Sequence, residues 1–200
     1  IEADALRYPN VTVEIDRARR TATWTIKAPV GDQPSDIAGI EAAGAAWYPL
    51  QMARELEDAI LSMRTNELDI GTWLIKTEGD AAAVLAMDAT LLALRDHWLV
   101  REIIHLMKRT LKRMDLTSRS FFAFIEPGSC FAGSLFELAL AADRSYMLDD
   151  ADQPNAISLS GMKIKWETLP EIQARQKLVV EMTSASGGVD GFFTSLHVEK

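Results

Sequence analysis

Residues 121–148 are the most informative part of the chain. They read Phe-Phe-Ala-Phe-Ile-Glu-Pro-Gly-Ser-Cys-Phe-Ala-Gly-Ser-Leu-Phe-Glu-Leu-Ala-Leu-Ala-Ala-Asp-Arg-Ser-Tyr-Met-Leu. The pattern predicts an apolar strand over 121–125, a turn of small residues, a helix over 133–142 and a strand over 145–148. Strand, helix and strand in this order are typical of right-handed crossovers between parallel neighbours. We therefore expect an α/β fold with a largely parallel sheet.

The chain on the amino side of this stretch supports the same fold class. Apolar and polar residues alternate over residues 10–28 with a short polar break, which predicts a β-hairpin. Periodic apolar positions predict amphipathic helices over 48–64 and 97–115. A short apolar run over 70–77 predicts a buried strand, and an Ala- and Leu-rich run over 81–94 predicts another helix. The segment between Pro29 and Gly39 is rich in turn formers and predicts an exposed loop.

Composition excludes several classes of protein. The 200 residues carry a formal net charge of −8, which argues against a nucleic-acid partner, and no apolar run is long enough to span a membrane. Cys130 is the single cysteine, so an intrachain disulfide is excluded and a reducing compartment, the cytoplasm, is expected. No secretory signal pattern is visible at the start, which is Ile1, and we expect the chain to belong to a longer polypeptide.

The turn before residues 133–142 is the best candidate for chemistry. Gly133 and Ser134 open the predicted helix, and the unpaired backbone N–H groups at a helix start can stabilise a developing oxyanion. Glu137 follows within the first turns and can donate or accept a proton there. The alternative is that Gly133 and Ser134 only permit tight strand–helix packing and that Glu137 faces solvent.

The same residues carry a resemblance to a known family. The run from Ala132 to Asp143, Ala-Gly-Ser-Leu-Phe-Glu-Leu-Ala-Leu-Ala-Ala-Asp, resembles the signature of the crotonase (enoyl-CoA hydratase/isomerase) superfamily. The resemblance implies a crotonase-like spiral of βαβ units with an opening hairpin, over a domain of residues 4–162. Residues 163–200 would form a divergent tail, in which the periodicity predicts a helix over 169–182.

A closer resemblance within the superfamily rests on residues 73–80, 95–102 and 125–133. These segments are similar to a lyase that cleaves the ring of a dihydrodiol derived from benzoyl-CoA and is built from two crotonase-like halves. This chain resembles the later half. The resemblance implies an acyl-CoA lyase component that uses no redox cofactor and no metal, with a CoA thioester as its substrate.

The resemblance also implies roles for individual residues. Backbone N–H groups at Gly133 and Ser134 would form half of an oxyanion hole for the thioester carbonyl, and Glu137 would act as acid and base. A second family glutamate follows a proline, but this chain has Asn155 there, which can bind substrate but cannot act as a base at neutral pH. Glu126, at the end of a strand, is a second candidate for acid–base work, or else it only bonds to local backbone.

Departures from the family pattern support an alternative function. The other half of the oxyanion hole would fall near residues 81–85, which match the family poorly, and residue 155 lacks a carboxylate. The chain is then a non-catalytic, degenerate crotonase-like module that supports an active half or a dimer. In either case the helices over 48–64 and 97–115 hold more apolar surface than the tail can cover. We therefore expect this surface to dock in a homo-oligomer or on a partner half of the same polypeptide.

Other chemistries have weaker support. The three histidines are not spaced as metal ligands with Cys130, which we expect to be buried and inert. The basic face of the helix over 97–115 is either solvated or a site for a polyphosphate ligand.

Overall fold

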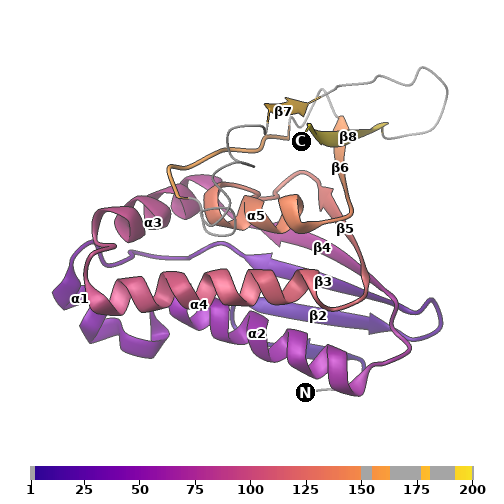
Figure 1. Cartoon of the computed structure of the whole chain (residues 1–200), viewed down its shortest axis with the longest axis horizontal. Coiled ribbons are helices and arrows are strands. Elements are labelled where there is room, and N and C mark those ends of the chain that lie inside the picture. The colour runs from indigo at the N-terminus through magenta and orange to yellow at the C-terminus, as the bar shows by residue number, and fades with distance from the viewer. Residues whose placement is uncertain (1–2, 150–154, 163–176, 181–191, 200) are drawn as a thin grey trace.

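The computed structural model describes residues 3–149, 155–162, 177–180 and 192–199. The chain opens with a three-stranded antiparallel meander (Figure 1). It consists of β1 (Ala5–Arg7), β2 (Val11–Asp16) and β3 (Thr21–Lys27). The hairpin predicted over 10–28 is thus confirmed, and β1 was missed because three residues are too few to show a period.

After the meander the sheet grows by parallel strands, each joined to the last through helices. The strand order β1-β2-β3-β4-β5-β6-β8-β7 follows the chain as far as β6, and the last two strands are antiparallel additions. The elements after the meander are α1 (Ile37–Ala43), α2 (Tyr48–Asn66), β4 (Thr72–Glu78), α3 (Ala81–Ala93), α4 (Trp98–Asp115), β5 (Ser120–Ile125), α5 (Gly133–Ala141), β6 (Arg144–Asp149), β7 (Lys177–Val180) and β8 (Phe192–Glu199).

The predicted α/β class is confirmed by this pairing, since β5 and β6 are adjacent and parallel with Phe122 opposite Arg144. Two predictions need correction. The loop predicted up to Gly39 is too long, because Asp36 caps α1 by accepting a hydrogen bond from the Gly39 backbone N–H at 2.7 Å. The helix predicted over 169–182 lies mostly outside the described residues, and its described part, Lys177–Val180, is strand β7, paired with β8.

The core lies between the sheet and the helix layer. Along β3, Ala22, Trp24 and Ile26 are fully buried while the threonines between them are not, as a period of two requires. Trp24 contacts Trp73 of β4 with 4.4 Å between ring centroids, and Trp73 contacts Phe121 of β5 at 5.0 Å. This row of aromatic rings joins three consecutive parallel strands under the helices.

Helices α2, α4 and α5 lie together on one face of the sheet (Figure 1). The apolar faces of α2 and α4 are buried there, with Leu56, Ile60 and Met107 each at most 4% exposed. The expected docking surface on these two faces is therefore inside the core. Trp98, at the start of α4, stays 59% exposed.

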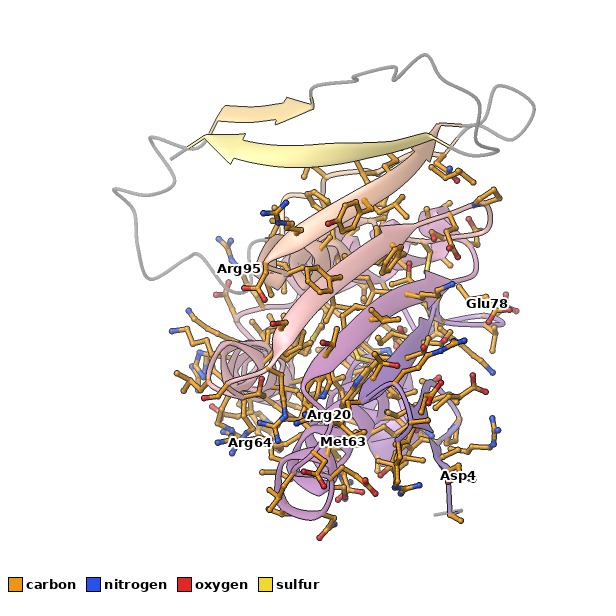
Figure 2. The ribbon with its side chains drawn as sticks, turned by 90° about the vertical axis from the view of Figure 1, so that its right-hand side faces the viewer. Asp4, Arg20, Met63, Arg64, Glu78 and Arg95 are labelled. Carbon is orange, nitrogen blue, oxygen red and sulfur yellow. The ribbon has the colours of Figure 1, made fainter. Side chains whose placement is uncertain are left out.

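No described helix covers the opposite face of the sheet (Figure 2). We call this the open face, and it carries alternate, half-buried side chains of β3 to β6, among them Thr23, Leu74, Phe122, Phe124 and Tyr146. The ring of Tyr146 stacks on that of Phe124 with 5.6 Å between centroids. The open face thus has an aromatic strip at its β5–β6 side.

Candidate active site at the start of helix α5

The turn from β5 into α5 is held by backbone and side-chain hydrogen bonds. The Ser129 hydroxyl accepts from the Glu126 backbone N–H at 2.9 Å, and the Ser129 N–H donates to the Glu126 carbonyl at 2.9 Å. The Cys130 N–H donates to the Thr77 hydroxyl of β4 at 2.9 Å. The turn is therefore fixed at the carboxyl edge of parallel strands, where α/β sheets usually bind ligands.

The two backbone donors proposed for an oxyanion hole both have acceptors within the chain. Gly133 has a φ of +46° and donates its N–H to the Ser158 carbonyl at 2.8 Å. Ser134 donates its N–H to Oδ2 of Asp88 at 2.7 Å. A thioester oxygen can bind the Ser134 N–H only if it replaces the Asp88 carboxylate.

Asp88 is the site residue that sequence reasoning missed. It lies on α3, is 1% exposed, and also accepts a 2.7 Å hydrogen bond from the Ser160 hydroxyl. Burial raises the pKa of the Asp88 carboxyl, and the hydrogen bonds from Ser134 and Ser160 partly offset that rise. One signal was available: an aspartate inside an Ala- and Leu-rich helix is costly to bury unless it has partners.

Glu137 is buried rather than solvent-facing, with 5% of its surface exposed. The solvent-facing alternative for this residue is therefore wrong. Glu137 is three positions after Ser134 on α5, so the two side chains are neighbours on one helix face.

Glu126 lies elsewhere. Its carboxylate pairs with the Lys76 ammonium at 2.8 Å, and the two side chains are 39% and 37% exposed. Ile75 and Ile125 are buried under the helices, so strand alternation places Lys76 and Glu126 on the open face. The structure therefore does not bring Glu126 to Glu137, which belongs to the helix layer.

Asn155 serves the local structure. Its side-chain amide donates to the Leu148 carbonyl at 2.6 Å and so ties its segment to β6. The backbone of the same segment is also attached to the start of α5. The Gly133 N–H donates to the Ser158 carbonyl, and Ala132 and Ser158 form an isolated parallel bridge.

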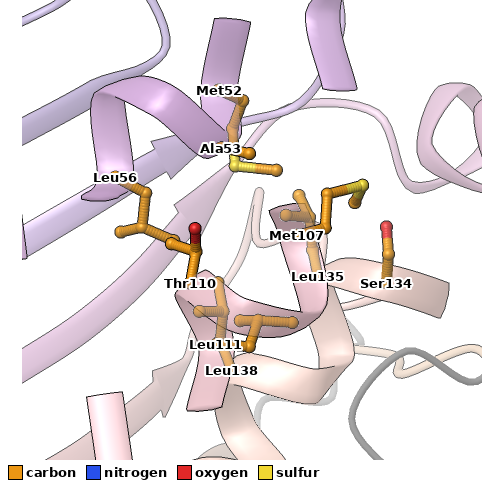
Figure 3. Close-up of a pocket in the computed structure, with 9 residues that line it drawn as sticks. All are labelled: Met52, Ala53, Leu56, Met107, Thr110, Leu111, Ser134, Leu135 and Leu138. Carbon is orange, nitrogen blue, oxygen red and sulfur yellow. The ribbon is translucent and has the colours of Figure 1, made fainter. Parts of the chain in front are cut away.

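A small cavity lies below the first turn of α5 (Figure 3). Its volume is about 10 Å³, which is at the limit for one water molecule. Among the described residues, the hydroxyls of Thr110 and Ser134 are buried without a hydrogen-bond partner, and both residues line this cavity. The other lining residues are apolar: Met52, Ala53, Leu56, Met107, Leu111, Leu135 and Leu138. The cavity is too small for an acyl group.

Three further expectations concern Cys130, metal ligands and the basic face of α4. Cys130 is buried as expected, and burial raises the pKa of its thiol, which leaves it a poor nucleophile. Within the described ranges, no three His, Cys, Asp or Glu side chains gather as metal ligands, and no helix is long and apolar enough to cross a bilayer. On the basic face of α4, Arg109 and Arg113 lie 3.9 and 3.0 Å from Glu57.

The fold is of the α/β class, with an opening hairpin followed by parallel βαβ units. Its site has a glycine turn followed along the chain by a buried glutamate. The crotonase resemblance implies these features in this order along the chain. The particular resemblance is confirmed by sequence. The chain is 51% identical over 178 residues to benzoyl-CoA-dihydrodiol lyase of Aromatoleum evansii. That match covers 89% of this chain, which spans about a third (32%) of the length of the lyase.

Other comparisons are weaker. No protein-family profile matches the chain. An enoyl-CoA hydratase of Geobacillus kaustophilus superposes with a TM-score of 0.45 at 16% identity, covering 72% of this chain and 47% of its own. An enoyl-CoA hydratase/isomerase of Marinobacter aquaeolei gives 0.44 at 16% identity, with 70% and 52% covered.

Proposed function

We propose that this chain is one component of an acyl-CoA lyase that cleaves the ring of a dihydrodiol derived from benzoyl-CoA. The observation that carries the proposal is the 51% identity to benzoyl-CoA-dihydrodiol lyase over 178 residues. At that identity over most of this chain, a shared fold and a related role are the simplest account. Because the chain spans about a third of that lyase (32%), the complete activity belongs to a longer polypeptide or an assembly.

In this proposal the α5 turn supplies electrostatic stabilisation. Breaking the ring C–C bond leaves negative charge that a thioester carbonyl can accept, and N–H groups at a helix start stabilise that oxyanion. Gly133 and Ser134 would supply these N–H groups once their internal acceptors are replaced. The proposed reaction needs neither metal nor redox cofactor, because it only redistributes charge within the substrate and transfers protons.

Proton transfer is assigned to glutamates. Glu137 is the first candidate, since it is buried next to the turn, on the same helix as Ser134. Glu126 is the second, because it lies at the carboxyl edge of β5. Asn155 is proposed to bind substrate through its side-chain amide once that amide releases the Leu148 carbonyl.

Substitution of Glu137 tests this assignment in the complete enzyme. Glu137→Gln keeps the volume of the side chain and removes its proton chemistry, so turnover should fall at least ~100-fold. Glu102→Gln, an exposed glutamate of another helix, is the matched control and should leave turnover unchanged. Melting curves of both variants establish that they are folded. Unchanged turnover in a folded Glu137→Gln enzyme removes Glu137 from the mechanism.

A second candidate function is a non-catalytic module that supports an active half. It is favoured by the hydrogen bonds that already engage the N–H groups of Gly133 and Ser134. Calorimetric titration of the 200-residue chain with a CoA thioester separates the two functions. Saturable binding supports a working site, and its absence supports the structural module.

We also propose that the chain works in the cytoplasm as a homo-oligomer or beside a partner half. The open face supports a partner there, since its half-buried apolar side chains include Leu74 and Phe122. Light scattering tests this on the isolated chain. A stable monomer of 22.2 kDa that binds no hydrophobic dye would contradict it.

A further inference from the structure

We propose that a groove between the last turns of α2 and α4 binds a small ligand with two or three linked phosphate groups. The groove has a volume of about 470 Å³, within the range of ~300–1,000 Å³ that is typical of small-molecule sites. Its basic side chains come from both helices: Arg64 from α2, and Lys108, Arg109, Lys112 and Arg113 from α4. In Figure 2, which views the molecule from this end, Arg64 lies beside the last turns of the two helices.

The groove lies at the opposite edge of the sheet from the start of α5. Helix α4 ends at Asp115 and β5 begins at Ser120, so the last turn of α4 is near the amino end of β5. Helix α5 instead follows the carboxyl end of β5. The groove is therefore separate from the candidate active site, and the proposed lyase chemistry does not use it.

The charge of the groove favours an anion. No described acidic side chain lines it, although Glu57 lies close by, 3.9 Å from Arg109 Nε and 3.0 Å from Arg113 Nη2. When Glu57 and Asp115, the last residue of α4, are counted against the five basic residues, the net charge is still +3. The whole chain has a net charge of −8, so this positive region is local and opposite in sign to the rest of the protein.

The arrangement of these cations is unfavourable without an anion. Lys108 and Lys112 are four positions apart on α4, where like charges repel, and Arg109 and Arg113 form a second such pair. The negative end of the helix dipole favours the cations of the last turn, Lys112 and Arg113. That effect falls off within one turn, so it does not account for Lys108 and Arg109. Arg64 brings one more positive charge to the same groove from α2. An anion that contacts both helices would relieve the repulsion.

Spacing and chemistry set the class of the anion. From Lys108 to Arg113 the basic positions extend over about 8 Å of α4, which is longer than one phosphate group. Arginine forms paired hydrogen bonds with phosphate oxygens, and lysine adds a point charge. Leu116, which is 71% exposed, lines the groove as well and offers an apolar contact to an organic part of the ligand. Linked phosphates therefore fit this groove better than a single phosphate.

Calorimetric titration of the 200-residue chain with inorganic triphosphate tests the proposal, in a buffer free of divalent cations. We expect saturable binding at one site. Triphosphate should bind at least about 10-fold more tightly than orthophosphate, because it contacts more of the cations at once. Equal binding of the two anions would indicate an adventitious ion only and would overturn the proposal.

The groove variant combines Arg109→Gln with Lys112→Gln, since both side chains are exposed. It should bind triphosphate at least about 10-fold more weakly than wild type. The matched control combines Arg19→Gln with Lys27→Gln, which removes the same charge at exposed positions of the β2–β3 hairpin. The control should bind like wild type. Equal weakening in the two variants would mean that triphosphate responds only to net charge, against the proposal.

Thermal unfolding gives a second readout and shows whether each variant is folded. Triphosphate at about ten times its wild-type Kd should raise the melting temperature of wild type by about 3–6 °C, and that of the groove variant by only about 1 °C. The absence of saturable binding to wild type would overturn the proposal. Tighter binding of hexaglutamate than of triphosphate would also overturn it, in favour of an acidic protein partner. Triphosphate is not a thioester, so none of these results depends on whether the chain belongs to a lyase.

Discussion

Gly79, at the end of β4, passes so close to Ala28 that a Cβ at position 79 would lie 2.7 Å from the Ala28 Cβ. The same glycine has a φ of +126° and donates its N–H to the Gly128 carbonyl at 3.0 Å. Gly79 therefore joins the carboxyl ends of β3 and β4 to the turn that leads into α5.

We predict that Gly79→Ala lowers the free energy of unfolding by about 2–4 kcal/mol, from backbone strain and from the clash with Ala28. Urea unfolding measures the loss. Gly71→Ala is the control, because a Cβ at Gly71 meets no atom within 4 Å and its φ is not in the left-handed range. Equal stability of Gly79→Ala and wild type would show that the turn can move away from β3.

Asp88 should give the folded protein a specific pH dependence. Burial raises the pKa of this carboxyl, so the folded state binds its proton more tightly than the unfolded state. The resulting stability is complete below the unfolded pKa, about 4, and is lost as pH rises through the folded pKa. Asp88→Asn removes the titrating carboxyl group, so the variant lacks this contribution to the pH dependence.

The measurement is a series of urea unfolding curves at several pH values from about 4 upward. We expect the free energy of unfolding of Asp88→Asn, relative to wild type, to increase with pH over this window. A relative stability that stays flat, or one that decreases with pH, would contradict a raised pKa for Asp88.

The ion pair between Lys76 and Glu126 should matter little for stability. Lys76 Nζ and Glu126 Oε2 are 2.8 Å apart, but both side chains are more than a third exposed, and water screens the attraction in such pairs. A double-mutant cycle with Lys76→Met and Glu126→Gln should give a coupling of about 1 kcal/mol or less. A coupling above about 2 kcal/mol would mean that the open face is shielded from water in solution.

The elements with a strong period could be predicted from sequence. Trp24, Leu56 and Met107 all pack in one large core. Each of their segments is therefore apolar on the side that faces this core, and the local sequence pattern identifies that side. Segment β1 has too few residues to show a period, and α1 begins inside a run of turn formers.

The site was harder to predict because it depends on tertiary contacts. A local motif predicts Gly133, Ser134 and Glu137 as site residues. The acceptor for the Ser134 N–H, however, is Asp88, which lies 46 residues earlier in the chain. No local pattern shows that α3 brings a carboxylate to α5. The position of Glu126 on the open face follows from strand alternation once Ile125 is known to be buried.

The order of the strands has a consequence for biosynthesis. From β1 to β6, each strand pairs with the strand made just before it, so a growing chain never waits for a later segment to complete an earlier strand pair. Domains generally fold during synthesis from the amino end. The meander can therefore form first, and each crossover can dock on it in turn as it leaves the ribosome. The contact between Asp88 and Ser134 closes only when α5 has emerged, after β1 to β5 have been made and before β6, β7 and β8.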